Sequence, residues 1–168
     1  MRILSVNEAA NLLGASDLTA FIEQVDWKYP DSVPTYMLPK DSGKKVGIAR
    51  IIANSLLDHK SFLLWVTATG IWSSSEHCDL FNRYRLSFGD HRSLYEALVH
   101  LLEAEDRDAA ISLLSLGLFF FWDLEIVAVD RSIAITVSHD EWMEVRHSEG
   151  YSRMAAELEK HLSSLFHA

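Results

Sequence analysis

The sequence is poor in cysteine, proline and long apolar runs. Its single cysteine, Cys78, excludes an internal disulfide, and the three prolines all fall at residues 30–39, which predicts one irregular connection. The longest apolar run, residues 109–122, is shorter than the roughly 20 residues that a membrane-spanning helix needs. The N-terminal residues also lack an apolar stretch followed by a small-residue cleavage site. These absences favour a cytoplasmic protein that does not enter a membrane.

Positive charge is also scarce. The chain has 15 Lys and Arg residues against 24 Asp and Glu, a formal net charge of −9, and its only basic clusters are Lys44-Lys45 and Arg83-x-Arg85. Nucleic-acid binding needs a basic stripe that displaces counterions from phosphates, so we expect no nucleic-acid partner. The excess of acid suits a basic protein partner, or it serves only to keep the chain in solution.

Length and composition indicate one folded unit. The 168 residues are 49% hydrophobic and 23% charged, which is ordinary for a globular protein and unlike a disordered one. No internal repeat, low-complexity tract or Gly/Ser linker divides the chain. We therefore expect residues 1–168 to form a single domain with one core.

Helix signals dominate the sequence. The capping-box pattern Ser-x-x-Glu, in which serine and glutamate each satisfy a backbone N–H of the other, occurs four times and predicts four helix starts. Apolar residues at helical spacing predict three more helices. The four patterns are Ser5/Glu8, with a helix reaching about Val25, Ser73/Glu76, with a helix that Gly89 ends, Ser93/Glu96 and Ser138/Glu141; the further helices are expected at 44–57, 107–120 and 152–165.

Strand signals are fewer. Residues 62–69 are apolar and rich in β-formers, while 124–129 and 133–137 flank Asp130-Arg131-Ser132, which predicts a hairpin. The expected fold is therefore α+β, with a small antiparallel or mixed sheet of about three strands packed against six or seven helices.

The run Ser138-His139-Asp140-Glu141-Trp142 has the most chemical character. It offers a hydroxyl, an imidazole and two carboxylates where a strand is expected to end, which makes His139 and Asp140 the candidate catalytic pair. Adjacent side chains point apart, however, so the run is not itself a catalytic triad. A capping box explains Ser138 and Glu141 without any function, and favourable placement at a helix start explains Asp140.

A second polar cluster spans residues 72–79. Trp72 and Glu76 in this cluster, together with Trp142, are candidates for lining a ligand pocket. The cluster also contains His77, Cys78 and Asp79, but contiguous residues cannot all converge on one ion, so we expect no metal site. Cys78 is more typical of a small buried side chain than of a nucleophile.

The third cluster joins Arg83-x-Arg85 to Gly89-Asp90-His91-Arg92. Paired guanidinium groups could bind a phosphate or carboxylate ligand, which makes Arg85 and Asp90 further ligand-binding candidates. The many carboxylates nearby in the sequence favour structural ion pairs instead.

Several of these residues together resemble a family of uncharacterised bacterial proteins. The pattern is W-x-T-x-x-G-I-W-x-S-S-E at residues 65–76, then Y-R at 84–85, S-F-G-D at 87–90 and S-H-D-E at 138–141. It covers roughly residues 61–145, and Ser73 stands where the pattern has a proline. That family has no assigned activity, so the resemblance implies a bacterial cytosolic protein and transfers no catalytic residue.

Two functional hypotheses follow. The first is a non-catalytic interaction or regulatory module that binds another protein, because no reaction motif is present and the middle of the chain is acidic. The second is a small enzyme or ligand-binding domain without a cofactor. In the second, His139 would be the general acid or base, Asp140 its orienter and Arg85 an anion anchor, in a pocket completed by Trp72, Glu76, Asp90 and Trp142. The sequence carries no signal for an oligomeric state.

Overall fold

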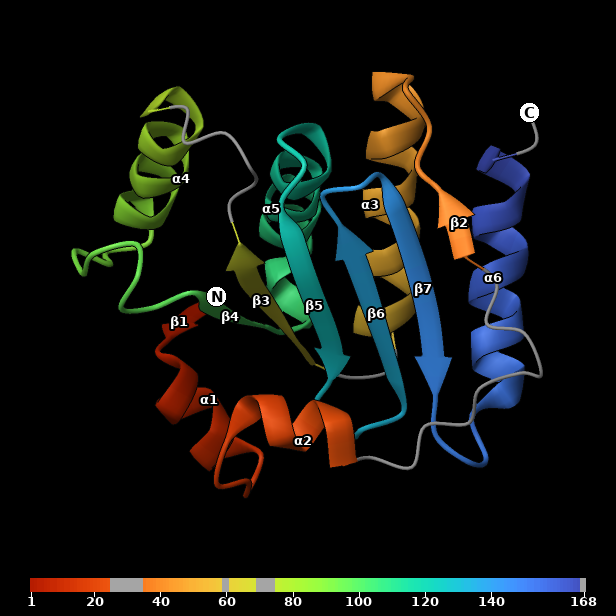
Figure 1. Ribbon diagram of the computed structural model, residues 1–168, viewed down its shortest axis with the longest axis horizontal. Helices are drawn as coiled ribbons and strands as arrows, with labels where there is room; N and C mark the ends of the chain where they lie inside the picture. Colours follow the sequence, from red (N-terminus) through yellow and green to blue (C-terminus); the bar gives the residue numbers. More distant parts are fainter. Residues whose placement is uncertain (25–34, 59–60, 69–74, 167–168) are drawn as a thin grey trace.

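The computed structural model describes residues 1–24, 35–58, 61–68 and 75–166. Within these ranges the chain forms seven strands and six α-helices, with a short 3-10 turn at Ala104–Asp106 (Figure 1). The strands are β1 (Arg2–Leu4), β2 (Thr35–Met37), β3 (Phe62–Ala68), β4 (Val99–Leu102), β5 (Asp123–Ala128), β6 (Ile133–Ser138) and β7 (Trp142–His147). The helices are α1 (Val6–Leu12), α2 (Leu18–Gln24), α3 (Ser42–Leu57), α4 (Ser75–Ser87), α5 (Arg107–Phe119) and α6 (Ser152–Phe166).

All seven strands belong to one antiparallel sheet in the order β1-β4-β3-β5-β6-β7-β2. Strands β5, β6 and β7 follow one another as a meander. Strands β3 and β6 end, and β5 and β7 begin, at the same end of the sheet, which is the upper end in Figure 1. The end of β3, the start of β5 and the turn that joins β6 to β7 therefore lie close together.

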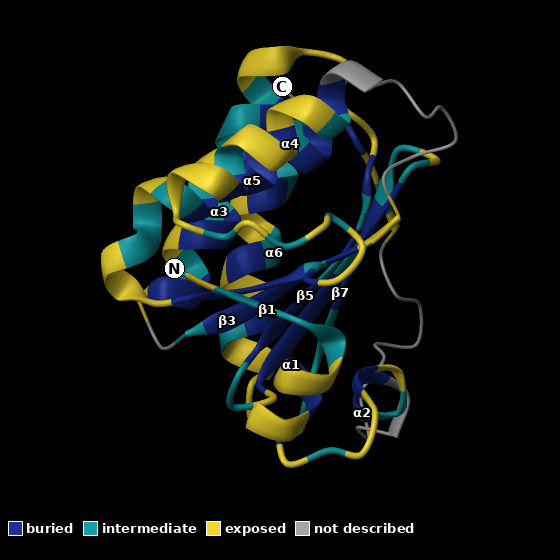
Figure 2. Ribbon diagram, turned by 90° about the vertical axis from the view of Figure 1, so that its left-hand side faces the viewer, coloured by how far each residue is buried: buried dark blue, intermediate teal, exposed yellow. Residues whose placement is uncertain are grey.

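Helices cover the two faces of the sheet unequally. Helices α3, α5 and α6 pack on one face and form the main core, and α4 lies on the same side (Figure 2). Helices α1 and α2 pack on the other face over a smaller apolar cluster that includes Leu63, Val99 and Leu101. Among the described residues, no helix is long and apolar enough to cross a membrane.

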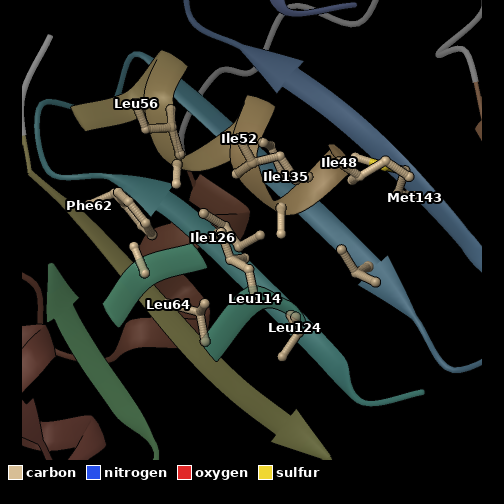
Figure 3. Close-up of a cluster of buried hydrophobic side chains, with 14 of the residues drawn as sticks. Ile48, Ile52, Leu56, Phe62, Leu64, Leu114, Leu124, Ile126, Ile135 and Met143 are labelled. Atoms are coloured by element: carbon tan, nitrogen blue, oxygen red, sulfur yellow. The ribbon is translucent and has the colours of Figure 1, made fainter. Parts of the chain in front are cut away.

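The main core follows from strict alternation along the strands. Leu124 and Ile126 of β5 face α3 and α5, whereas Asp123 and Glu125, at the intervening positions, must face the other side. Figure 3 shows this core from within, with the labelled side chains of Ile48, Ile52, Leu56, Phe62, Leu64, Leu114, Leu124, Ile126, Ile135 and Met143.

The expected sheet of about three strands is wrong, because the sheet has seven. Strands β1 and β2 contain only three residues each, too few to show a period, and each is held by pairing with a distant strand. Strand β4 is buried on both faces, so its sequence Val-His-Leu-Leu lacks polar alternation and reads equally well as part of a helix.

Two of the four predicted helix starts are turns. The backbone N–H of Ser93 donates to the Glu96 carboxylate at 2.8 Å, but the chain closes a single turn there and continues into β4. Ser138 and Glu141 bracket the β6–β7 turn, in which the Glu141 N–H donates to the Ser138 carbonyl at 3.1 Å. Serine and glutamate three residues apart satisfy a turn as well as a helix start, and the pairing strand decides between them.

The other predicted elements have clearer outcomes. Helices α3, α5 and α6, strand β3 and the β5–β6 hairpin form at the expected positions. The helix expected from Ser5 does begin with a capping box, but it stops at Leu12, and Gly14 at φ 67° separates it from α2. Gly89, at φ 80°, follows the end of α4 as expected, while the start predicted at Ser73 lies outside the described residues.

Candidate functional site

Asp123 and His139 form a close pair at the upper end of the sheet. Asp123 is the first residue of β5, and His139 directly follows β6, its antiparallel neighbour. The His139 ring Nδ1 lies 2.9 Å from both carboxylate oxygens of Asp123, and the His139 backbone N–H donates to the same carboxylate at 2.7 Å. Two contacts from one residue hold the imidazole in a single orientation.

This geometry sets the protonation of His139. A carboxylate only accepts hydrogen bonds, so Nδ1 carries the proton and Nε2 is the atom that gains or loses one. The hydrogen bond and charge of Asp123 raise the pKa of His139, with a smaller contribution from Asp140, whose carboxylate lies 3.6 Å from Nε2. The imidazole side chain is 32% exposed, so a partner can reach it.

A polar row crosses the sheet beside this pair, on the face of α1 and α2. The register places Trp65 of β3 opposite Glu125 of β5, Glu125 opposite Thr136 of β6, and Thr136 opposite Glu144 of β7. The Glu125 carboxylate accepts hydrogen bonds from the Thr136 hydroxyl at 2.9 Å and from Nη2 of Arg146 at 2.8 Å. Burial raises the pKa of Glu125, against the opposing effect of Arg146.

A hollow of about 310 Å³ opens above this row. We call it the Trp65 hollow, and it is lined by Thr19 and Ile22 of α2, Trp65 and Thr67 of β3, Glu125 of β5 and Arg146 of β7. Thr67 connects the hollow to the histidine pair, because its hydroxyl donates to the backbone carbonyl of Asp123 at 3.1 Å. Asp123 and Glu125 are two residues apart on one face of a strand, about 7 Å.

Three of the predicted site residues gather here. His139 and Asp140 lie in the β6–β7 turn, and Trp142 opens β7 opposite Ser138. Trp142 alternates with the core residue Met143, so it lies on the same face of the sheet as the Trp65 hollow. Asp140 is largely exposed, and Asp123, not Asp140, orients the histidine.

Arg85 and Asp90 lie elsewhere. Arg85 belongs to α4, which lies on the same side of the sheet as the main core (Figure 2), and its side chain is fully buried. Its Nη2 donates to the Asp90 carboxylate at 3.1 Å and its Nη1 to the Ser93 carbonyl. Although burial opposes it, hydrogen bonds from Arg92 and Arg85 hold the pKa of Asp90 well below its usual range. The sheet separates this ion pair from His139, so Arg85 does not join that histidine in one pocket.

Residues 69–74, including Trp72, lie outside the described residues, and for Glu76 only its place in α4 is described. Next to it, His77 is buried, and its Nδ1 accepts a hydrogen bond from Trp122 Nε1 at 3.0 Å. This hydrogen bond ties the first turn of α4 to Trp122, the residue that precedes Asp123 in the chain. Among the described residues, no three His, Cys, Asp or Glu side chains gather closely enough to hold a metal ion.

Sequence reasoning missed Asp123, Glu125, Trp65, Thr67 and Arg146. Their common signal is period-two alternation of polar with apolar residues, as in Asp-Leu-Glu-Ile at the start of β5 and Met-Glu-Val-Arg in β7. Such alternation marks a sheet face that is not fully covered by apolar packing.

Comparison with models of protein families, with curated proteins and with solved structures finds no match. The resemblance to an uncharacterised bacterial family stays a prediction, and any function must be argued from the geometry of this site.

Proposed function

We propose that the chain binds a small molecule in the Trp65 hollow and that His139 exchanges a proton or a hydrogen bond with it. The observation that carries the proposal is the joining of the hollow to the Asp123–His139 pair through Thr67. The hollow draws its lining from three strands and α2, as ligand sites commonly do, and its volume is at the lower end of the roughly 300–1,000 Å³ of such sites.

The histidine pair supports proton transfer. A general acid or base works best when its pKa lies near the working pH, and a carboxylate on Nδ1 both fixes the imidazole and stabilises its protonated form. Asp123 raises the pKa of His139 above its ordinary value of 6.5, so the protonated imidazole persists to higher pH. Nε2 is then the atom that would face a bound molecule.

Thermal denaturation of the purified chain against a chemically diverse panel of small molecules tests this proposal. Thr67→Val removes the connecting hydroxyl at nearly constant volume, and Thr35→Val makes the same change at an exposed position of β2. We expect a compound that raises the melting temperature of the parent and of Thr35→Val, and raises that of Thr67→Val and His139→Gln by less. A panel that stabilises none of the proteins, or all four equally, would reject the proposal.

A second candidate, the binding of another protein, is favoured by exposed apolar side chains at the same end of the sheet. Met37 is 64% exposed and Phe121 40%, and Phe120 beside it is also exposed. Phe121 has a φ of 55°, an unfavourable conformation for an aromatic residue that costs on the order of 1–3 kcal/mol. Asp140 and Glu141 nearby would suit a positively charged partner.

Affinity capture with identification of the retained proteins tests the second candidate. Phe121→Ser removes the exposed ring, and Leu80→Ser makes a comparable change on the exposed side of α4. We expect that the parent chain and Leu80→Ser capture one identifiable basic protein and that Phe121→Ser does not. That protein should bind the purified chain more weakly as the salt concentration rises. Equal retention by both variants would exclude this surface.

A further inference from the structure

We infer that the ligand of the Trp65 hollow is a free organic cation that carries N–H donors on an apolar stem, such as an alkylguanidine or an alkylamine. The inference rests on the proposed small-molecule function and adds the chemical class. Hydrogen-bonding capacity, charge and shape of the hollow each support it.

The hollow presents hydrogen-bond acceptors. The Thr67 hydroxyl uses its hydrogen on the Asp123 carbonyl, which leaves its oxygen to accept. The Glu125 carboxylate accepts one hydrogen bond on each oxygen, from Thr136 and from Arg146, although a carboxylate has about four acceptor positions. A ligand that satisfies both groups must bring at least two N–H or O–H donors.

The charge around the hollow is negative. Nη2 of Arg146 lies 2.8 Å from the Glu125 carboxylate and compensates its charge. Glu144 adds negative charge, because it is close enough to raise the pKa of Glu125. Asp123 adds more, since it lies two residues from Glu125 on the same face of β5. Among the described residues, three carboxylates therefore lie in or beside the hollow, against the guanidinium of Arg146 and the imidazole of His139. This excess favours a cation over an anion.

Two residues give the hollow an apolar part of its wall. The indole of Trp65 is packed against the smaller apolar cluster, and Ile22 of α2 also lines the hollow. A cation over an indole face gains on the order of 0.5–2 kcal/mol, and a short alkyl stem would contact Ile22. The acceptor oxygens of Thr67 and Glu125, together with the indole of Trp65, suit a guanidinium or ammonium group.

The test uses four ligands with one butyl stem, titrated into the isotopically labelled chain and followed by NMR. Butylguanidine and butylamine are cations with N–H donors, butyltrimethylammonium is a cation without them, and butyrate is an anion. We expect the first two to shift the signals of Trp65 and Thr67, butyltrimethylammonium to bind at least ten-fold more weakly, and butyrate not to bind.

Variants locate the binding. Glu125→Gln and Thr67→Val should each weaken butylguanidine binding at least ten-fold, whereas Glu105→Gln, at an exposed position outside the hollow, should leave it unchanged. Thr67→Val keeps the test decisive if Glu125→Gln unfolds, because it leaves the Glu125–Arg146 ion pair intact.

The outcomes separate the inference from the function on which it rests. If butyrate bound more tightly than butylguanidine, or butyltrimethylammonium bound equally well, the ligand would not be a cation with N–H donors. The hollow would still be a small-molecule site. No shift in the hollow with these ligands or with the diverse panel would reject both. A blocked Gly-Arg-Gly peptide supplies the same guanidinium from a protein side chain, and tighter binding of that peptide than of butylguanidine would overturn the assignment to a free molecule.

Discussion

The carboxylate of Asp123 holds His139 through two atoms, accepting from its backbone N–H at 2.7 Å and from Nδ1 of its ring at 2.9 Å. The contact ties the first residue of β5 to the β6–β7 turn, so the orientation of the imidazole depends on the sheet register and not on the turn alone.

The first prediction concerns pH. The pKa of His139 is raised in the folded state, so its contribution to stability is fully present below the unfolded pKa of about 6.5 and is lost as pH rises through the folded pKa. Asp123→Asn should therefore lower the free energy of unfolding more at about pH 6 than at about pH 8.5, as measured by urea denaturation. Asp140→Asn, at 3.6 Å and largely exposed, should show a smaller pH dependence. An identical loss at both pH values for Asp123→Asn would contradict the pairing.

The second prediction concerns the buried ion pair. Removing the charge of Arg85 leaves the Asp90 carboxylate with less compensation under α4, so Arg85→Met should cost about 3–5 kcal/mol of unfolding free energy. Arg153 in α6 also contacts a carboxylate, Glu157, but its side chain is 92% exposed. Arg153→Met should change stability by less than about 1 kcal/mol in the same chemical denaturation. Similar losses in the two variants would mean that Arg85 is not structural.

The third prediction compares two helix glycines. A Cβ at Gly117 would lie 2.6 Å from Cδ1 of the buried Leu124, whereas one at Gly47 would lie 2.9 Å from Cδ1 of the half-buried Leu165. Alanine in place of a helix glycine gains up to about 1 kcal/mol from propensity, and overpacking a core costs about 1–3 kcal/mol. Thermal denaturation should show a lower melting temperature for Gly117→Ala and an equal or higher one for Gly47→Ala. The reverse order would show that α5 can move away from β5.

The fourth prediction concerns Tyr84, whose hydroxyl donates to the Ala109 carbonyl at 2.7 Å and links α4 to α5. Burial raises the pKa of Tyr84 to about 12. Tyr84→Phe should cost about 0.5–1.5 kcal/mol in urea denaturation, the usual net value of one hydrogen bond. Tyr95→Phe, at the most exposed aromatic position of the described residues, should have almost no effect. In a spectrophotometric titration, the tyrosine ionisation at the highest pH should disappear in Tyr84→Phe and remain in Tyr95→Phe.

Elements with a strong local pattern were predictable from the sequence. Helices α3 and α5 have apolar residues at helical spacing, and the β5–β6 hairpin has a polar turn between two β-rich runs. Strands β1, β2, β4 and β7 were not predicted, because each depends on a partner far away in the sequence or begins next to a Ser-x-x-Glu pattern that also fits a helix. A Ser-x-x-Glu pattern looks the same before a helix and before a strand, and only pairing with another strand distinguishes the two outcomes.

The candidate site was predictable in part for the same reason. His139, Asp140 and Trp142 are conspicuous within one short segment, whereas their neighbours Asp123 and Thr67 come from other strands. Which strand residues meet depends on strand order, and that order is set by long-range packing that no local pattern encodes. Arg85 was assigned to the predicted pocket because of its charge, but it belongs to α4, which lies on the opposite side of the sheet.

The short outer strands have a consequence for how the sheet is completed. Both come from the first quarter of the chain, but β1 pairs through Arg2 and Leu101, and β2 through Thr35 and Glu144. During synthesis β1 waits for residues 99–102 and β2 for residues 142–147, so the border formed by β2 is the last that can close. Until its three-residue strand pairs, the backbone edge of β4 or of β7 is open to other chains, and that short strand is what protects it.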